Sequence, residues 1–274
     1  MLLGDAQALA AKGAELRQVS ETDPFPSLLK VLEGVNVVVN LLPGGASRDL
    51  MDALIQAVVQ RHVKVYFPTE FGVDRRKDYW AWSQRESADK NAHDRKTRDL
   101  GQGKLKFVDV YSGLFLEMYF ASFFGFDHNT YTSLGTRDKK ITFTSKADIG
   151  RALAELSILV LTPAISARVP DQIRISGSAI SFTDARDIVQ RVRREFGNIS
   201  EVSLKGVDLE TTRKGVQESL ANNSNFSPIP LLHLTLNEGQ IDFSDNDNEL
   251  VNPNQSVWKW KTVEDLTRER KGFA

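Results

Sequence analysis

The chain has 274 residues, with 35 lysines and arginines against 36 aspartates and glutamates, so its formal net charge at pH 7 is −1. This length suits one large domain, or one domain with a smaller appended region, and the balanced charge provides no basic field for holding nucleic-acid phosphates. The chain contains no cysteine, which excludes disulfides, thiol catalysis and cysteine-ligated zinc.

The first half of the chain alternates strand-like runs with helix-like segments. Strands are expected at residues 15–19, 35–39, 63–67 and 105–110. Helices are expected at residues 6–12, 24–32 and 88–100, and after Ser47, which is placed to cap a helix carrying an apolar stripe. Strand and helix in alternation predict a parallel sheet built from right-handed crossovers. The valine-rich run at 35–39 predicts a strand buried on both faces.

The second half is less regular and predicts a smaller α+β lobe. Strands are expected at residues 141–144, 172–176 and 202–204, and helices from Asp148, from the capping residue Thr183 to Phe196, and over 208–220. Residues 241–249 are strongly acidic and are expected to form an extended tail. The resulting division places a Rossmann part at about 1–125, a substrate lobe at 126–220 and a C-terminal extension at 221–274.

The sequence has no feature that is typical of a membrane protein. The first residues lack the basic and apolar regions of a signal peptide, and no run approaches the roughly 20 apolar residues of a spanning helix. The sequence therefore predicts a cytoplasmic protein without membrane or nucleic-acid partners. His62, His128 and His233 show no ligand spacing, so no metal is predicted.

Ligands of open parallel sheets bind beyond the carboxyl ends of the strands, which directs attention to the loops at 41–45, 68–74 and 111–117. The second loop contains F-P-T-E-F-G at residues 67–72. Asp89-Lys90, Gly113-Leu114-Phe115 and T-S-K-A-D-I-G at 144–150 follow at matching places. Over roughly residues 6–220 the chain resembles the NmrA-like, isoflavone-reductase-like branch of the atypical short-chain dehydrogenases.

This resemblance implies a Rossmann-like fold that binds NADP or NAD. Family members begin with a strand, a G-x-x-G-x-x-G turn and a helix, and no such glycine triad precedes Ala6. The expectation is therefore an N-terminally truncated Rossmann sheet, in which the strands at 15–19 and 35–39 each keep an unpaired edge. Weak dinucleotide binding and a homo-oligomer formed through such an edge are expected to follow.

The resemblance also implies a set of site residues, with Lys90 as the catalytic residue. The positions implied for the cofactor are Leu41, Pro43, Gly44, Pro68, Thr69, Glu70, Phe71, Lys90, Gly113 and Phe115. The positions implied for the substrate are Phe71, His93, Leu114 and Phe115. Three of these residues have a structural alternative, which is an ion pair of Lys90 with Asp94 four residues on, a pairing of His93 with Asp89, and a place in the core for Phe71.

The leading functional interpretation is an NAD(P)-dependent reductase of a small aromatic or phenolic molecule. The resemblance implies that hydride passes to the substrate in a cleft formed by Phe71, Lys90 and Phe115. No lysine completes a Y-x-x-x-K pair with Tyr111, so the Ser-Tyr-Lys mechanism is not predicted. Two alternatives are a non-catalytic regulator that senses dinucleotides and contacts a protein partner, and an inactive fragment. Lys90 argues against the regulator, because regulatory members commonly lack this lysine.

Overall fold

The computed structural model describes residues 3–43, 46–74, 76, 85–120, 126–127, 129–134, 137–222 and 228–272. Its residues group into two units. The first unit consists of Met1–Thr69 and Lys90–Phe107, and the second of Glu70–Asp89 and Val108–Ala274.

A three-stranded parallel sheet forms the centre of the first unit. It contains β1 (Val37–Val39), β2 (Val65–Phe67) and β3 (Lys106–Phe107) in the order β1-β2-β3. Val38 is opposite Tyr66, and Tyr66 is opposite Phe107. The predicted α/β class with parallel strands is therefore confirmed.

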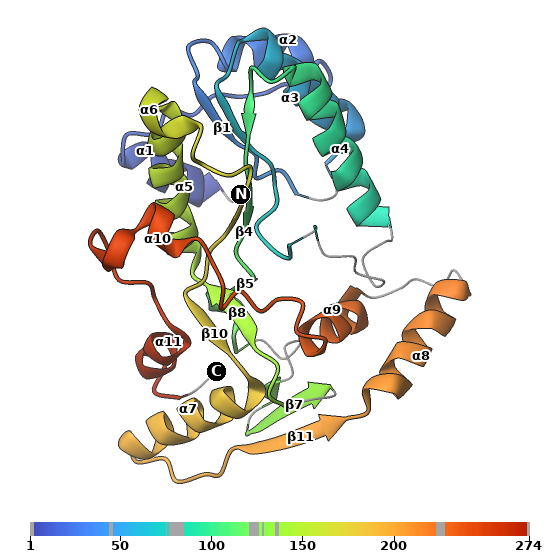
Figure 1. The fold of residues 1–274 in the computed structure, drawn as a ribbon, viewed down its shortest axis with the longest axis vertical. Coiled ribbons are helices and arrows are strands. Elements are labelled where there is room, and N and C mark those ends of the chain that lie inside the picture. The colour runs from blue at the N-terminus through green and yellow to red at the C-terminus, as the bar shows by residue number, and fades with distance from the viewer. Residues whose placement is uncertain are drawn as a thin grey trace. The chain divides into compact units, whose positions relative to one another are not determined.

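Four helices accompany these strands, namely α1 (Leu3–Ala11), α2 (Pro24–Val31), α3 (Arg48–Gln60) and α4 (Arg85–Gly101) (Figure 1). The α3 helix begins as predicted at Ser47, whose side chain accepts a hydrogen bond from the Leu50 amide. The α2 and α3 helices pack together, and Leu28, Leu54 and Val58 share one apolar core with residues of β2 and β3. Burial of these aliphatic side chains holds the helices against the sheet.

One strand prediction for this unit is wrong, and another holds only in part. Residues 15–19 form no strand; instead, the Arg17 side chain bonds Glu15 and the carbonyl of Val31. Among the described residues, β1 pairs with β2 alone, which agrees with the predicted unpaired edge. The expected burial of this strand on both faces is wrong, because Val39, in a short strand at the sheet edge, is 36% exposed.

The second unit is a mixed α+β assembly of short strands. The strand expected at 105–110 is interrupted at Val108, so β4 (Asp109–Tyr111) is separate and pairs in parallel with β9 (Gln172–Arg174). A second sheet has the order β10 (Ser178–Ile180), β8 (Ile141–Thr144), β5 (Leu114–Phe115). A third has the order β11 (Ser203–Val207), β7 (Thr130–Leu134), β6 (Phe126–Asp127). The β10–β8 and β6–β7 pairs are antiparallel, and the β5–β8 and β11–β7 pairs are parallel.

The apolar core of the second unit includes Phe143 of β8 and, from two helices, Phe182 and Leu266. The longer helices are α5 (Lys146–Leu161), α7 (Phe182–Glu195), α8 (Leu209–Ala221), α9 (Pro228–Asn237) and α11 (Val263–Glu269), and the shorter ones η2 (Leu116–Met118), α6 (Pro163–Ser166), α10 (Asn248–Val251) and η4 (Pro253–Gln255). The predicted cap of α7, Thr183, is wrong. Ser181 is the cap, in a reciprocal capping box with Asp184.

The acidic segment expected to be an extended tail is instead packed into this core. Ile241 and Phe243 are fully buried. The Ile241 carbonyl accepts a hydrogen bond of 2.8 Å from the Thr142 amide, and the Phe243 amide donates one of 2.8 Å to the Thr142 hydroxyl. Apolar residues at every second position turn inward along β8, and this burial outweighs the charge of the acidic residues between and after them.

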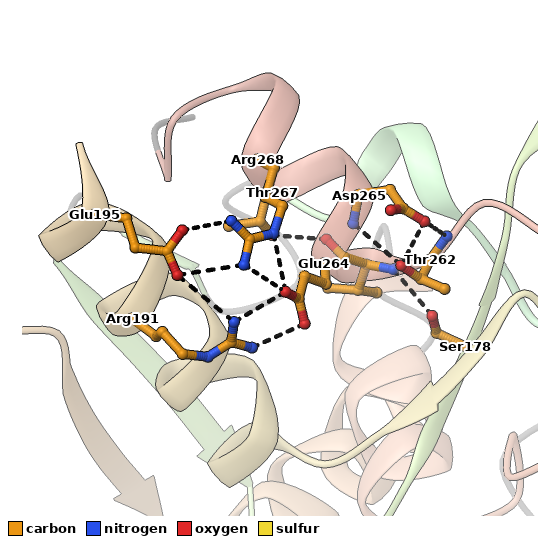
Figure 2. A network of polar contacts seen from close by, with 9 residues as sticks. Ser178, Arg191, Glu195, Thr262, Glu264, Asp265, Thr267 and Arg268 are labelled. Atoms are coloured by element: carbon orange, nitrogen blue, oxygen red, sulfur yellow. Dashed lines mark hydrogen bonds and ion pairs between the residues drawn. The ribbon is translucent and has the colours of Figure 1, made fainter.

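The α7 and α11 helices are joined by a cluster of ion pairs, which Figure 2 shows at close range. Glu264 accepts hydrogen bonds from Arg191 at 2.9 and 2.8 Å and from Arg268 at 2.9 Å. Arg268 also pairs with Glu195. Hydrogen bonds from the two guanidinium groups lower the pKa of Glu264 to about 2. This clamp fixes the C-terminal helix to α7.

None of the helices in the described ranges combines the length and the apolar character that crossing a bilayer requires.

Candidate functional site

The F-P-T-E-F-G loop begins where β2 ends, and α4 brings Lys90 to it. The half-buried Lys90 donates a hydrogen bond from Nζ to the carbonyl oxygen of Thr69 at 3.3 Å. Pro68, which directly precedes Thr69, is buried. Two motifs that are separated in the sequence thus meet at the carboxyl end of a parallel strand, where ligands of such sheets bind.

Beside this loop lies a buried polar chain that the sequence did not indicate. Asn40 directly follows β1, and its backbone N–H donates a hydrogen bond to the carbonyl oxygen of Phe67 at 2.8 Å. The Asn40 Nδ2 atom donates to the Tyr66 hydroxyl at 2.9 Å, and the Tyr66 hydroxyl lies 2.9 Å from Nε2 of His93. Burial raises the pKa of Tyr66 well above its usual range. A polar residue directly after three valines was the available signal for Asn40.

Asn40 also shapes the loop after β1. Its Oδ1 atom accepts a hydrogen bond from the Leu42 amide at 2.9 Å, which closes a local turn. Leu41 is 70% exposed, and Pro43 is exposed as well. The third residue predicted here, Gly44, lies outside the described residues.

In the second unit, the remainder of the signature loop meets the loop after β4. The Gly113 amide donates to the Gly72 carbonyl at 3.1 Å. Gly113 has a φ of +66°, and a Cβ atom there would lie 2.4 Å from the Thr142 carbonyl oxygen. A glycine is thus required for this close approach. Glu70 is buried and Phe71 is half-buried.

Gly113 lies between the hydroxyl of Ser112 and the two apolar side chains of Leu114 and Phe115. Leu114 and Phe115 are half-buried in β5, and the Lys146 ammonium lies 5.3 Å from the centre of the Phe115 ring. The Ser112 hydroxyl is buried and has no hydrogen-bond partner within the described part of the chain. A buried hydroxyl without a hydrogen-bond partner is uncommon in proteins. Ser112 therefore places a buried polar group directly after β4.

A buried carboxylate that the sequence did not indicate anchors the chain just after the signature loop. Asp74 is fully buried and accepts hydrogen bonds from Arg76 at 2.6 Å and from Arg174 at 2.7 Å. Burial alone raises the pKa of Asp74, but the hydrogen bonds from Arg76 and Arg174 outweigh burial and lower it. The group joins the loop to β9.

The predicted residues thus fall into two sets. The first unit holds Leu41, Pro43, Pro68, Thr69, Lys90 and His93, and the second holds Glu70, Phe71, Gly113, Leu114 and Phe115. Within the ranges that the structure describes, no three histidine, aspartate or glutamate side chains gather to hold a metal ion.

Comparison with known proteins adds sequence and fold relatives. No family model matches the chain. An NmrA-like family domain-containing oxidoreductase of Gibberella moniliformis (strain M3125 / FGSC 7600) is 31% identical over 179 residues. The match covers 64% of this chain and 54% of the relative, so it spans about half of that protein's length.

Solved structures share the fold at low sequence identity. The leucoanthocyanidin reductase–NADPH complex from Vitis vinifera matches with a TM-score of 0.71 and 18% identity, over 97% of this chain and 88% of that one. The complex of AtPrR2 with NADP+ and (+)pinoresinol matches with a TM-score of 0.74 and 14% identity, over 96% and 84%. An isoflavone reductase matches with a TM-score of 0.72 and 15% identity, over 98% and 87%. The resemblance predicted from the F-P-T-E-F-G motif is confirmed: the chain is similar in sequence to an NmrA-like family domain-containing oxidoreductase, and it shares the fold of the solved leucoanthocyanidin and isoflavone reductases.

Proposed function

We propose that the protein is an NAD(P)H-dependent reductase of a small molecule with an aromatic or phenolic ring. The hydrogen bond from Lys90 to the Thr69 carbonyl carries this proposal, because it holds a cationic side chain at the strand end that opens the signature loop. Structures with this fold hold NADPH, or NADP+ together with pinoresinol, and the sequence relative is described as an oxidoreductase.

The residues at the two strand ends suit the nicotinamide side of a dinucleotide. Leu41 is an exposed apolar side chain on a loop whose backbone Asn40 holds in place. In the first unit, we further assign Pro68, Thr69 and Lys90 to the cofactor. For the second unit, taken by itself, we assign Phe71 and Phe115 to ligand binding. A bound reduced nicotinamide supplies hydride.

Lys90 is assigned the proton-handling role. As hydride adds to an acceptor, negative charge develops on the substrate oxygen or carbon, and a nearby ammonium stabilises this charge and can donate a proton. The ammonium of Lys90 carries three N–H groups, and one of them is held by the Thr69 carbonyl at the strand end. Leu114 and Phe115 are apolar, which favours an uncharged ring over a highly charged substrate.

Dinucleotide oxidation in the presence of aromatic carbonyl and enone compounds tests the proposal. Lys90→Ala should lower kcat/KM by about 10²–10⁴-fold, the usual contribution of a general acid. Lys96→Ala is the matched control on the same helix, because Lys96 pairs with Asp52 instead, and it should retain activity.

The same assay separates the proposal from its alternatives. If the 274-residue chain is inactive, the chain preceded by a strand, a G-x-x-G-x-x-G turn and a helix is assayed in the same way. Dinucleotide binding without turnover of any compound would indicate a regulator. Turnover that survives Lys90→Ala would show that Lys90 is not catalytic.

A further inference from the structure

We propose that His93 is a positioning residue that sets the loop from Leu41 to Pro43 through Tyr66 and Asn40, and thereby sets the affinity for the dinucleotide. The inference rests on the proposed function in one respect, because this loop is there assigned to the cofactor. The loop geometry itself can be tested without any ligand.

The chemistry of each group determines which atom donates and which accepts in the hydrogen bonds that link Leu42, Asn40, Tyr66 and His93. The Leu42 amide can only donate, so the atom of Asn40 that it reaches must be the side-chain oxygen. The other terminal atom is then the NH₂ group, which can only donate, so the Tyr66 oxygen accepts from Asn40. The hydroxyl hydrogen of Tyr66 remains, and Nε2 of His93 at 2.9 Å is its acceptor.

This arrangement requires one form of the His93 ring. Nε2 accepts only when it carries no hydrogen, so the ring is neutral with its hydrogen on Nδ1. A protonated ring would present an N–H to the Tyr66 oxygen, which already accepts from Asn40, and the hydroxyl hydrogen would lose its acceptor. The raised pKa of Tyr66 agrees with a hydroxyl that keeps its hydrogen at neutral pH.

Burial makes each link of the chain matter. Tyr66 is fully buried and Asn40 is 3% exposed, so water replaces a lost partner poorly. His93 and Lys90 are three residues apart and share a face of α4. One helix face therefore holds Lys90 against Thr69 and, through Tyr66, holds Asn40 and the Leu41–Pro43 loop.

The test uses hydrogen exchange of the Leu42 amide, measured by NMR, in variants that differ in whether position 93 can accept a hydrogen bond. His93→Phe cannot accept and should speed exchange by about tenfold, the effect of losing roughly one hydrogen bond of stabilisation. His93→Gln retains an accepting oxygen and should restore the exchange rate. Arg95→Gln changes an exposed residue of the same helix and should leave it unchanged.

Two further measurements complete the experiment. Ring ¹⁵N shifts of His93 should show hydrogen on Nδ1 and none on Nε2. Calorimetric affinity for NADPH, measured on the 274-residue chain or on the glycine-turn extension if only that binds, should fall in His93→Phe and recover in His93→Gln. Tyr66→Phe retains the ring but not the hydroxyl, and it replaces His93→Phe in both assays if that variant does not fold.

The outcomes are distinguishable. Unchanged Leu42 exchange in His93→Phe and Tyr66→Phe, or hydrogen on Nε2 of His93, overturns the inference. NADPH affinity that ignores both substitutions while Leu42 exchange responds overturns the link to the cofactor. A Leu42 response with no dinucleotide bound by either form of the chain supports the positioning chain and contradicts the proposed function.

Discussion

Gly113 illustrates how one residue permits the loop after β4. Its φ of +66° lies in the left-handed region, and a Cβ atom would lie 2.4 Å from the Thr142 carbonyl oxygen and 2.8 Å from the Thr142 Cβ. Any side chain must therefore displace β8 or the loop. At the same residue, the backbone amide bonds Gly72 in the signature loop.

Gly113→Ala should lower the free energy of unfolding by about 2–4 kcal/mol, combining the cost of a left-handed conformation with that of overpacking. Gly150→Ala is the matched control, because Gly150 lies in α5 with nothing within 4 Å of an added Cβ. It should stabilise the protein by about 0.5–1 kcal/mol. Urea unfolding measures both, and equal effects of the two substitutions would contradict this account.

Among the site residues, those within a sequence motif could be predicted, whereas those whose role depends on neighbouring strands could not. The F-P-T-E-F-G motif directed attention to Thr69 and Lys90, which the structure joins by a hydrogen bond. Asn40 and Tyr66 belong to no such motif, and their roles depend on β1 and β2 being neighbours. A tyrosine inside a strand is indistinguishable from an ordinary core residue until its hydroxyl finds partners. His93 was predicted at the substrate, and the structure shows its Nε2 beside Tyr66.

At the scale of elements, the α7–α11 clamp links stability to pH. The pKa of Glu264 is about 2 in the folded protein, against 4.5 for the free side chain, because Arg191 and Arg268 donate hydrogen bonds to it. A depressed folded-state pKa means that the stabilisation is complete above about pH 4.5. It is lost as the pH falls from there toward 2.

Glu264→Gln should therefore flatten the fall in stability between about pH 4.5 and 2. At pH 7 it should cost only about 1 kcal/mol, because the pair is partly exposed and screened by solvent. Chemical unfolding at a series of pH values provides the measurement, and Arg186→Gln, which lies on α7 and pairs with Asp187 outside the clamp, is the control. An unchanged slope in Glu264→Gln would show that Glu264 contributes nothing to acid sensitivity.

Elements were predictable where their signals are local. Ser47 has a capping side chain ahead of an apolar stripe, and the α3 helix begins there. Residues 15–19 alternate like a strand, but a strand also needs a neighbour, and Arg17 instead reaches the carbonyl of Val31. In the acidic segment, charge suggested a solvated tail, whereas Ile241 and Phe243 at alternate positions were the better guide.

For the whole molecule, the edge of β1 predicts self-association. Among the described residues β1 has a partner on one side only, and Val39 and Leu41 are 36% and 70% exposed. An open valine-rich edge can pair with another chain. Sedimentation velocity should show larger species at higher concentration, and Val39→Lys should reduce them. Ile199→Lys, which alters a residue 88% exposed in the second unit, should not. A wild-type chain that stays monomeric throughout would contradict the prediction.

The affinity of the 274-residue chain for a dinucleotide can be predicted from the groups that bind pyrophosphate in proteins of this fold. In Rossmann-like proteins, the pyrophosphate binds backbone N–H groups of a glycine-rich turn at a helix N-terminus. The 274 residues contain no G-x-x-G-x-x-G, and the residues that we assign to the cofactor are proposed for its nicotinamide side. We therefore expect calorimetry to show that this chain binds NADPH and NADH more weakly than low micromolar.

Adding such a turn should change this result in a defined way. Two hydrogen bonds to a charged phosphate, at about 1.5 kcal/mol each, correspond to roughly a hundredfold in affinity. The chain preceded by a strand, a G-x-x-G-x-x-G turn and a helix should therefore bind NADPH at least about a hundredfold more tightly. Replacing the three glycines of that added turn by alanine is the control and should abolish the gain. Low-micromolar binding by the 274-residue chain would instead show that its own residues, beginning with the loop held by Asn40, are sufficient to hold the pyrophosphate.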